Sequence, residues 1–313
     1  MPEPLQHDES RPSGVALWWE AARPRTLPAS VAPVLVGTCV SERVAVDGLA
    51  PLWGRAALAL VVALSLQVAV NYANDYFDGV KGVDTAARVG PRRITAAGLA
   101  TPAQMRRAIL VALAVAGVAG LVLALLASPW LLLVGVAAGL ATLGYSGGPK
   151  PYASAGLGEL SVFVFFGLVA TSGSQFVQDE RFTAAGAVAG AAMGAWSVAL
   201  LLVNNLRDIE TDEAVGKRTL AVRIGERATR ALAAACLALP AALTVVVAAL
   251  VPSQPALLGV LAVAAAGPAL RIVRSAPVGP QLIAALGTTG RAQLVHAVLL
   301  SAGLVLGGRG VGA

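Results

Sequence analysis

Long apolar runs alternate with short polar segments along the chain, and acidic residues gather where some of the apolar runs end. Most of these runs approach the ~20 residues that an α-helix needs to cross a bilayer. They are rich in leucine, valine and alanine, which favours helices over the alternating strands of a membrane barrel. We therefore expect an all-α integral membrane protein, a bundle of nine transmembrane helices with polar loops capping one end. The predicted spans are about 27–40, 56–76, 108–126, 130–145, 157–176, 184–206, 231–250, 255–272 and 289–306.

Composition supports this class and excludes others. Hydrophobic residues make up 57% of the 313 residues and charged residues 13%, whereas a soluble domain carries about 25% charged residues. The two cysteines form no CxxC pair, and two histidines are too few for a histidine metal site or a catalytic triad. Residues 1–17 are predicted to form a polar N-terminal tail, and residues 18–313 a single transmembrane domain.

The basic residues define the expected orientation, because they are concentrated in alternate loops. One side of the predicted bundle carries nearly all of them, leaving only Arg43, Arg55, Arg181 and Arg309 for the other side. Such a bias is typical of the cytoplasmic side of a membrane protein. We therefore expect the N-terminus to be cytoplasmic and the C-terminus to lie outside. The net charge of +6 then needs no nucleic-acid partner.

The span predicted at 56–76 leads into a first acidic cluster. If the helix continues beyond this span, Asn71, Asn74, Asp75 and Asp78 fall at positions i, i+3, i+4 and i+7, which form one face. This face would lie at the cytoplasmic end of the helix.

A second cluster follows the span predicted at 184–206, where Asn204, Asp208 and Asp212 share a face at i, i+4 and i+8. Carboxylates are costly within a membrane, so two matched clusters indicate a function rather than two solvated helix ends. Magnesium takes oxygen ligands and is usually held by one or two carboxylates together with substrate phosphates. The two clusters therefore predict a divalent-metal site that binds a diphosphate.

Lysine is rare in this arginine-rich chain, and its placement favours phosphate binding. Lys81, Lys150 and Lys217 each lie in a loop of the expected cytoplasmic side, and two of them closely follow the acidic clusters. A lysine ammonium binds phosphate as a compact point charge. The alternative is that the charge bias alone favours lysine in these loops.

A diphosphate site built into a membrane suggests that the rest of the substrate is a lipid tail between helices. The expected reaction is ionisation of an allylic diphosphate and capture of the cation by an electron-rich acceptor. A lipid or ion transporter is the alternative from another class, although transporter sites usually lie near the membrane midplane. Gly135 and Gly139 in the fourth span, and Gly186, Gly190 and Gly194 in the sixth, either let helices pack closely or leave a groove for the tail.

The two acidic clusters resemble the NDxxDxxxD-type signature and the DxxxD motif of the UbiA superfamily of intramembrane aromatic prenyltransferases. Further blocks extend the resemblance from about Trp18 to the ninth span, and they are most similar to the branch that acts on 1,4-dihydroxy-2-naphthoate. The blocks that carry the resemblance are 22–28, 71–92, 145–152, 156–159 and 204–225.

The resemblance implies roles for individual residues. Asp84 departs from the family pattern, because it follows Asp78 by six residues rather than four. Glu159 has two interpretations, an ion pair with Lys150 or a hydrogen bond to an acceptor hydroxyl. The implied roles are catalysis for Asp75, Asp78, Asp84, Asp208 and Asp212; metal binding for Asn74, Asp78, Asp208 and Asp212; diphosphate binding for Lys81, Arg88, Lys150, Arg207, Lys217 and Arg223; and acceptor binding for Arg23, Tyr145 and Glu159.

The resemblance also implies a reaction and a location. A polyprenyl group would be transferred from polyprenyl diphosphate to 1,4-dihydroxy-2-naphthoate with loss of CO₂, giving a demethylmenaquinol in menaquinone biosynthesis. Mg²⁺ is the implied metal, with Mn²⁺ as an alternative. The protein would be a multi-pass protein of a bacterial plasma membrane, in contact with lipid and with a cytoplasmic active site. The same chemistry on another aromatic acceptor stays open, as does the transporter.

Overall fold

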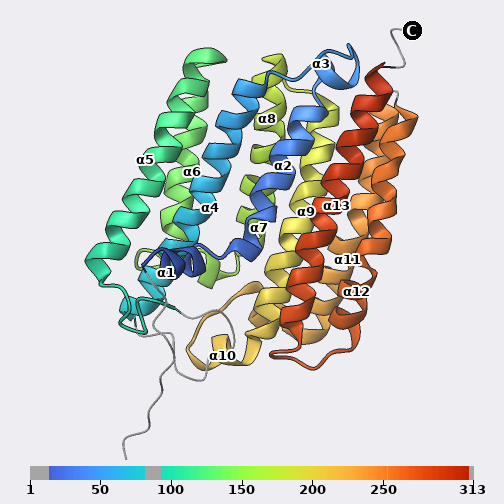
Figure 1. Cartoon of the computed structure of the whole chain (residues 1–313). Coiled ribbons are helices and arrows are strands. Elements are labelled where there is room, and N and C mark those ends of the chain that lie inside the picture. Colours follow the sequence, from blue (N-terminus) through green and yellow to red (C-terminus); the bar gives the residue numbers. More distant parts are fainter. Residues whose placement is uncertain (1–13, 82–92, 252, 310–313) are drawn as a thin grey trace, which may run out of the picture.

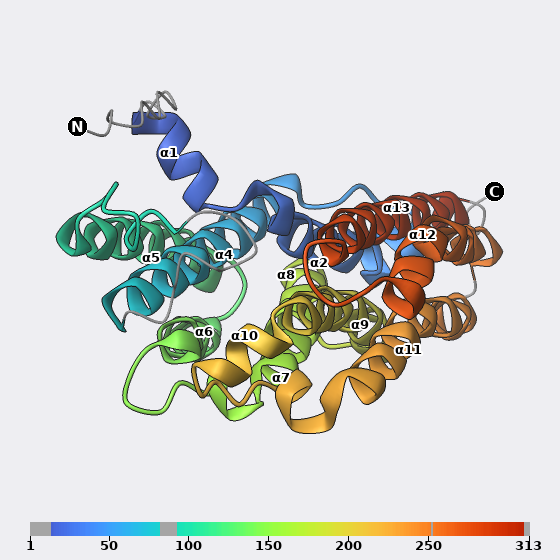
Figure 2. The same ribbon diagram turned by 90° about the horizontal axis from the view of Figure 1, so that it is seen from below.

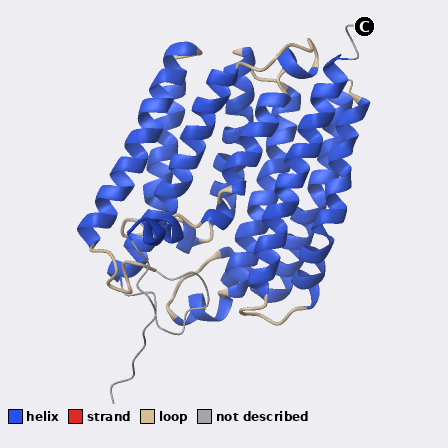
Figure 3. Ribbon diagram, viewed as in Figure 1, coloured by secondary structure: helices blue, strands red, loops and turns tan. Residues whose placement is uncertain are grey.

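Seven helical stretches are long and apolar enough to cross a membrane in the computed structural model, which describes residues 14–81, 93–251 and 253–309. Two shorter apolar helices, Pro28–Cys39 and Leu131–Ser146, accompany them. The regular structure of the described residues is helical, and no strand occurs among them (Figure 3). The predicted all-α class is confirmed with these seven candidate spans. The count of nine depends on the two shorter helices and stays a prediction.

The helices extend the predicted spans at the end that carries the acidic clusters. The helix that starts at Trp53 continues to Lys81, so the first cluster lies on its last turns. A π-helical segment (η3) interrupts the fifth predicted span, and short 3₁₀ turns (η1, η2, η4) join or begin others. The elements are α1 (Gly14–Ala21), η1 (Pro24–Thr26), α2 (Pro28–Cys39), α3 (Glu42–Ala45), α4 (Trp53–Lys81), α5 (Pro102–Leu126), α6 (Leu131–Ser146), η2 (Ala153–Ala155), α7 (Gly158–Val162), η3 (Phe163–Val169), α8 (Ala170–Asp179), α9 (Ala184–Arg207), α10 (Ile209–Ala214), α11 (Leu220–Leu250), η4 (Gln254–Leu261), α12 (Ala262–Ser275) and α13 (Leu282–Arg309).

The long helices stand side by side in one bundle, with α1 and α10 at the same end (Figure 1). Seen from that end, α4, α5 and α6 form one group and α9, α11, α12 and α13 another, with α2 and α8 between them (Figure 2). The predicted boundary between a tail and the domain, at residues 17 and 18, falls inside α1. The division into tail and domain itself stays a prediction.

The helix α9 lies at the centre of the larger group and is mostly buried. Trp196, Leu202 and Leu206 on this helix are at most 1% exposed and belong to the main hydrophobic core. Burial of apolar side chains against neighbouring helices supplies van der Waals contacts, which drive helix association where lipid removes the hydrophobic advantage. The core therefore fixes α9, whose last turn leads into the second acidic cluster.

Glycines let the π-helical segment η3 approach α9 closely. A Cβ atom added at Gly167 would lie 2.7 Å from the backbone N of Gly194, and one added at Gly194 would lie 2.7 Å from Cδ2 of Phe163. Gly190 also packs against this segment. The predicted small residues of the sixth span thus serve close packing. By contrast, Gly135 and Gly139 on α6 line a cavity, which is the other use that the sequence left open.

A chain of buried hydrogen bonds joins α9, α11 and α13. The indole N–H of Trp196 donates to Nδ1 of His296 at 2.7 Å, so the hydrogen of the neutral imidazole is on Nε2. Nε2 then donates to the hydroxyl of Thr244 at 2.7 Å, and that hydroxyl donates to the carbonyl of Pro240 at 2.8 Å. Each polar group finds a partner inside the bundle, as burial in a membrane requires. His296 therefore contributes to the packing of the three helices.

Candidate active site

Both acidic clusters open into one cavity of about 1510 Å³. Asn74 and Asp78 reach it from the last turns of α4, Asp208 from the junction of α9 and α10, and Asp212 from α10. The helical spacing predicted that Asn74 and Asp78 share a face, and the structure directs both toward this cavity. Residues more than 120 positions apart in the sequence therefore line a single site.

Ion pairs draw the two clusters together. Nζ of Lys217, in the loop after α10, lies 3.4 Å from Oδ1 of Asp78 on α4. The guanidinium of Arg93 donates to Oδ2 of the same carboxylate at 2.9 Å. Asp78 and Arg93 are both 7% exposed. Because buried ions need partners, these contacts hold the loop that precedes α5 and the loop that follows α10 against the end of α4.

Arg93 is the cavity residue that sequence reasoning missed most clearly. In the sequence, Arg93 counted only as one of many basic residues on the expected cytoplasmic side. No helical register connects it with Asp78, which lies 15 positions earlier. Only the folded path of the loop brings the two side chains together, so the sequence carried no signal for this pair.

The second cluster has its own internal cation. Nε and Nη2 of Arg207 donate to the two carboxylate oxygens of Asp208 at 2.7 and 2.6 Å. Arg207 is 5% exposed and lines the cavity, while Asp208 is 7% exposed. A two-point contact of this kind fixes the plane of the guanidinium. The pair therefore presents a rigid positive group beside a carboxylate.

Asp75 has a different environment from the one that its place in the cluster suggested. Its two carboxylate oxygens accept the backbone N–H groups of Ile94 and Thr95, each at 2.9 Å, and the side chain is 2% exposed. Asp75 is not among the residues that line the cavity. The carboxylate of Asp75 instead anchors the turn that positions Arg93, so Asp75 affects the site through Arg93.

Two of the predicted cations do not line the cavity. Lys150 is exposed in the loop after α6 and does not line the cavity. Arg223 is exposed, and its Nε donates to the carbonyl of Arg218 at 2.9 Å. Lys217 does line the cavity. Arg88 and Asp84 lie outside the described residues, as does the side chain of Lys81.

The oxygen atoms around the cavity suit a hard cation, although no metal cluster is assembled in advance. Within the described parts of the chain, no group of three or more histidine, cysteine, aspartate or glutamate side chains is arranged to hold a metal ion. The carboxylates are paired with arginine and lysine instead. Amide and carboxylate oxygens without sulfur or imidazole are nevertheless the ligand types of magnesium, which takes its remaining ligands from water and substrate phosphate.

Two of the three residues predicted to bind an acceptor line the cavity, and the third lies close to it. Arg23 and Tyr145 line the cavity, and Arg23 is held in the left-handed backbone region with φ of 53°. Glu159 lies just behind the wall, where its Oε1 accepts the amide of Asn205 at 2.9 Å. Asn205 itself lines the cavity. Glu159 therefore orients a cavity residue. Among the described residues it forms no ion pair with Lys150, and the hydrogen bond to an acceptor hydroxyl stays a prediction.

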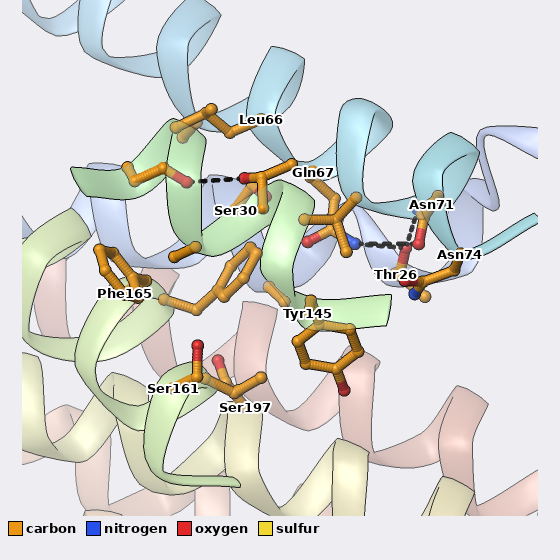
Figure 4. A pocket seen from close by; sticks show the side chains of 18 of the residues that line it. Thr26, Ser30, Leu66, Gln67, Asn71, Asn74, Tyr145, Ser161, Phe165 and Ser197 are labelled. Carbon is orange, nitrogen blue, oxygen red and sulfur yellow. Dashed lines mark hydrogen bonds between the residues drawn. The ribbon is translucent and has the colours of Figure 1, made fainter. Parts of the chain in front are cut away.

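Further polar groups line the cavity deeper in the bundle, and Figure 4 shows them around it. Gln67 and Asn71 donate to the hydroxyl of Thr26 at 3.1 and 3.0 Å. Gln67 precedes Asn71 by one helical turn, so extending the predicted polar face backwards would have found it. Ser161, on the other side, contacts the phenol of Tyr152 at 3.0 Å. Burial raises the pKa of Tyr152 above its ordinary value, and the hydrogen bond with Ser161 offsets part of this rise.

Beyond these polar groups the cavity becomes apolar and continues toward the other end of the bundle. Gly135 and Gly139 on α6 leave open space there, because a Cβ at either position would have no neighbour within 4 Å. Near the far end, Arg55 donates to the carbonyls of Leu126 and Val177 at 2.5 and 2.9 Å and ties three helices together. The apolar part is lined among others by Ala59, Val62, Leu66, Gly117, Gly120, Leu123, Leu131, Phe165, Phe166, Val169, Gly173 and Val177.

The charged end of the cavity, called the mouth here, is lined by Asn74, Asp78, Arg93, Arg207, Asp208, Asp212 and Lys217. A charged mouth joined to a long apolar cavity within a helical bundle defines a membrane protein that handles amphiphilic molecules with an anionic head and an apolar tail. The model of the UbiA prenyltransferase family matches residues 30–281. The chain therefore belongs to the UbiA prenyltransferase family, which confirms the resemblance seen in the sequence.

Individual relatives agree with this assignment. The 1,4-dihydroxy-2-naphthoate octaprenyltransferase of Mycobacterium tuberculosis is 45% identical over 296 residues, which cover 93% of this chain and 98% of the relative. Among solved structures, a UbiA homologue from Aeropyrum pernix has a TM-score of 0.64 at 17% identity, over 90% of this chain and 97% of that one. A UbiA homologue from Archaeoglobus fulgidus bound to DMAPP and Mg²⁺ has a TM-score of 0.62 at 14% identity, over 91% and 99%.

Proposed function

We propose that this chain transfers a polyprenyl group from polyprenyl diphosphate to 1,4-dihydroxy-2-naphthoate, with loss of CO₂, to give a demethylmenaquinol for menaquinone synthesis. The observation that carries the proposal is the single cavity in which both acidic clusters meet above an apolar channel. The relative of 45% identity named for this acceptor supports the choice of naphthoate. Its octaprenyl donor suggests a long tail here as well.

The cations at the mouth are proposed to bind the diphosphate. Arg93, Arg207 and Lys217 line the cavity beside Asp78 and Asp208. As the bond between prenyl carbon and oxygen breaks, the electron pair leaves with the diphosphate, and nearby fixed positive groups stabilise the charge that develops. Their ion pairs hold these groups in place before the substrate arrives. No movement of long side chains is then needed during the reaction.

A magnesium ion fits the same residues and would be held by Asn74, Asp78, Asp208 and Asp212. All four residues line the cavity that Arg207 and Lys217 also line. When bound, such an ion supplies positive charge to a diphosphate. The homologue from Archaeoglobus fulgidus bound to DMAPP and Mg²⁺ supports this assignment. Lys81, Arg88, Lys150 and Arg223 are proposed as outer contacts, and Asp84 as a further acidic residue of the mouth.

The acceptor is proposed to lie beside Arg23, Tyr145 and Asn205, at the border between the charged mouth and the apolar channel. Arg23 would attract its carboxylate, and Tyr145 would cover its ring system. Glu159 would hold the amide of Asn205 in one orientation through the bond at 2.9 Å. The electron-rich ring would then face the prenyl carbon that the departing diphosphate exposes.

Turnover is the direct test of this function. Purified protein in lipid should convert a radiolabelled polyprenyl diphosphate and 1,4-dihydroxy-2-naphthoate into a demethylmenaquinol with release of CO₂. EDTA should abolish the reaction, and added Mg²⁺ should restore it. A panel of acceptors separates the alternatives: transfer to 4-hydroxybenzoate alone would indicate another branch of the family. Transport of the donor without any transfer would contradict the enzyme.

We further propose that the Asp-cluster end faces the cytoplasm of a bacterial cell and that α2 and α6 also cross the membrane, giving nine spans. Cysteine labels test this. Glu213 on α10 and Asp47 after α3 are both exposed, at opposite ends of the bundle. A cysteine at position 213 should react with an impermeant reagent only from the cytoplasmic side, and one at position 47 only from outside. The reverse pattern would overturn the orientation.

Arg93 is expected to matter both for stability and for turnover. Breaking a buried ion pair costs about 3–5 kcal/mol, and Lys217 still contacts Asp78, so Arg93→Gln should lower the free energy of unfolding by about 2–3 kcal/mol. We expect kcat/KM to fall about tenfold or more, as loss of one charge-assisted contact to a diphosphate predicts. Thermal unfolding in detergent and steady-state kinetics measure the two effects.

The double variant Arg93→Gln/Asp78→Asn separates these roles. It removes both charges of the pair, so it should recover part of the lost stability and none of the activity. Arg106→Gln, at an exposed position on α5, is the matched control and should leave both quantities unchanged. Strictly additive losses of stability in the double variant would mean that the two side chains are not coupled.

A further inference from the structure

A second hollow lies on the outside of the bundle, between α11 and α12. It is a groove of about 990 Å³ at the end that carries the acidic clusters, and it shares no lining residue with the active-site cavity. Three arginines, Arg227, Arg230 and Arg274, border it, together with Glu226 and the turn Ser275–Pro277. A strip of alanines forms the rest of its wall.

The middle arginine fixes the shape of this groove. Nε of Arg230 donates to Glu226 at 2.8 Å, and its two terminal nitrogens donate to the carbonyls of Val273 and Ala276 at 2.5 and 2.8 Å. Arg230 thus neutralises Glu226 and fastens α11 to the C-terminal end of α12. The negative charge of Glu226 is balanced by Arg230, so the other two arginines give the groove a net positive charge.

Arg227 and Arg274 supply that charge. Both are exposed, and neither side chain forms a hydrogen bond or ion pair within the part of the chain that the structure describes. The backbone adds to the positive potential, because Gly225 has a φ of 78° and interrupts α11. The long part of the helix therefore begins at Glu226, so the positive end of its dipole lies at the same end as Arg227.

The floor of the groove is apolar and follows the helix into the membrane. Ala231, Ala234, Ala235 and Ala238 stand at i, i+3, i+4 and i+7, so they form one stripe along α11. Both α11 and the stretch that contains α12 are candidate membrane spans. Where these helices cross a membrane, the arginines would lie near the lipid headgroups and the alanines beside the acyl chains.

We propose that this groove binds one anionic phospholipid, with its phosphate between Arg227 and Arg274 and an acyl chain along the alanine stripe. Arginine is suited to phosphate through its planar donors, and basic pockets between membrane helices bind anionic headgroups. The general bias of arginine toward the cytoplasmic side explains charges on a surface. It does not explain why they border a groove whose floor consists of small apolar side chains.

The test uses the purified full chain in detergent, with dioleoylphosphatidylglycerol as the probe and dioleoylphosphatidylcholine and inorganic phosphate as comparisons. The anionic lipid should raise the midpoint of thermal unfolding by about 5 °C, and neither comparison should do so. Arg227→Gln/Arg274→Gln should weaken lipid binding about 25-fold, from roughly a fivefold effect for each arginine. Native mass spectrometry should show the corresponding loss of bound lipid.

Two further variants keep the test specific. Arg106→Gln/Arg107→Gln removes the same charge from exposed positions on α5 and should bind the lipid like the wild type. Ala235→Trp keeps every arginine and fills the groove, so it should also lose the lipid. Equal stabilisation by phosphatidylcholine or by phosphate alone would overturn the proposal. So would wild-type binding by Arg227→Gln/Arg274→Gln or by Ala235→Trp.

Discussion

Replacing Asp78 with asparagine is expected to lower prenyl transfer about 100- to 1,000-fold in a protein that remains folded. The substitution keeps the volume of the side chain and removes the charge that Arg93 and Lys217 both contact. Without that charge, the two cations lose their fixed partner, and the proposed metal ion would lose an anionic ligand. Steady-state turnover per folded molecule, with folding followed by size-exclusion chromatography, measures the effect.

Asp75 provides the contrast to this experiment. Its oxygens accept two backbone N–H groups, and an asparagine would place an NH₂ group against one of them. We expect Asp75→Asn to reduce stability by about 1–3 kcal/mol and to keep more activity per folded molecule than Asp78→Asn. Equal losses of activity in the two variants, without a difference in stability, would contradict the separate roles assigned here.

Filling the apolar channel at Gly135 is expected to make the enzyme selective for short donors. Gly135 lies 11 residues from Ser146, or about 16 Å along α6, so a phenylalanine there would meet the distal part of a long tail. We expect Gly135→Phe to lower kcat/KM for an octaprenyl donor about 10- to 100-fold, the range of forced overpacking. Geranyl diphosphate should be used as well as by the wild type.

The wild type is the reference for that result, since it is expected to accept several chain lengths. Gly54→Phe is the matched control: Gly54 has no neighbour within 4 Å of an added Cβ, and it does not line the cavity. This variant should show the wild-type dependence on chain length. If Gly135→Phe shows that dependence too, the tail follows another route out of the charged mouth.

Helical register explains which parts of the site could be predicted from the sequence. The spacing of Asn74 and Asp78 specified a common face, and that face lines the cavity in the structure. Register gives the direction of a side chain around its own helix but not the segment that it meets. Asp75 illustrates this limit, because its partners come from a loop nearly 20 residues away.

Residues in loops and at helix starts were the least predictable for the same physical reason. Lys150 and Arg223 occur in blocks that resemble the family, yet neither lines the cavity. Arg93 was counted only for its charge, and it contacts the central carboxylate. The outline of the fold depends on the apolar spans, which the sequence displays directly. The position of each cation depends on how the loops fold over the end of the bundle.

Because of the ion pairs within the mouth, folding of the bundle should not depend on a bound metal ion. Many small metalloproteins unfold without their ion, because their acidic or thiolate ligands repel one another or lose their only organising centre. Here Asp78 and Asp208 already have cationic partners within the chain, at 2.9 Å or less. The protein's own cations thus balance these carboxylates. A chelator should therefore remove activity and leave the helical bundle folded. Inactive protein purified in chelator would then be a reservoir that regains activity when the ion returns.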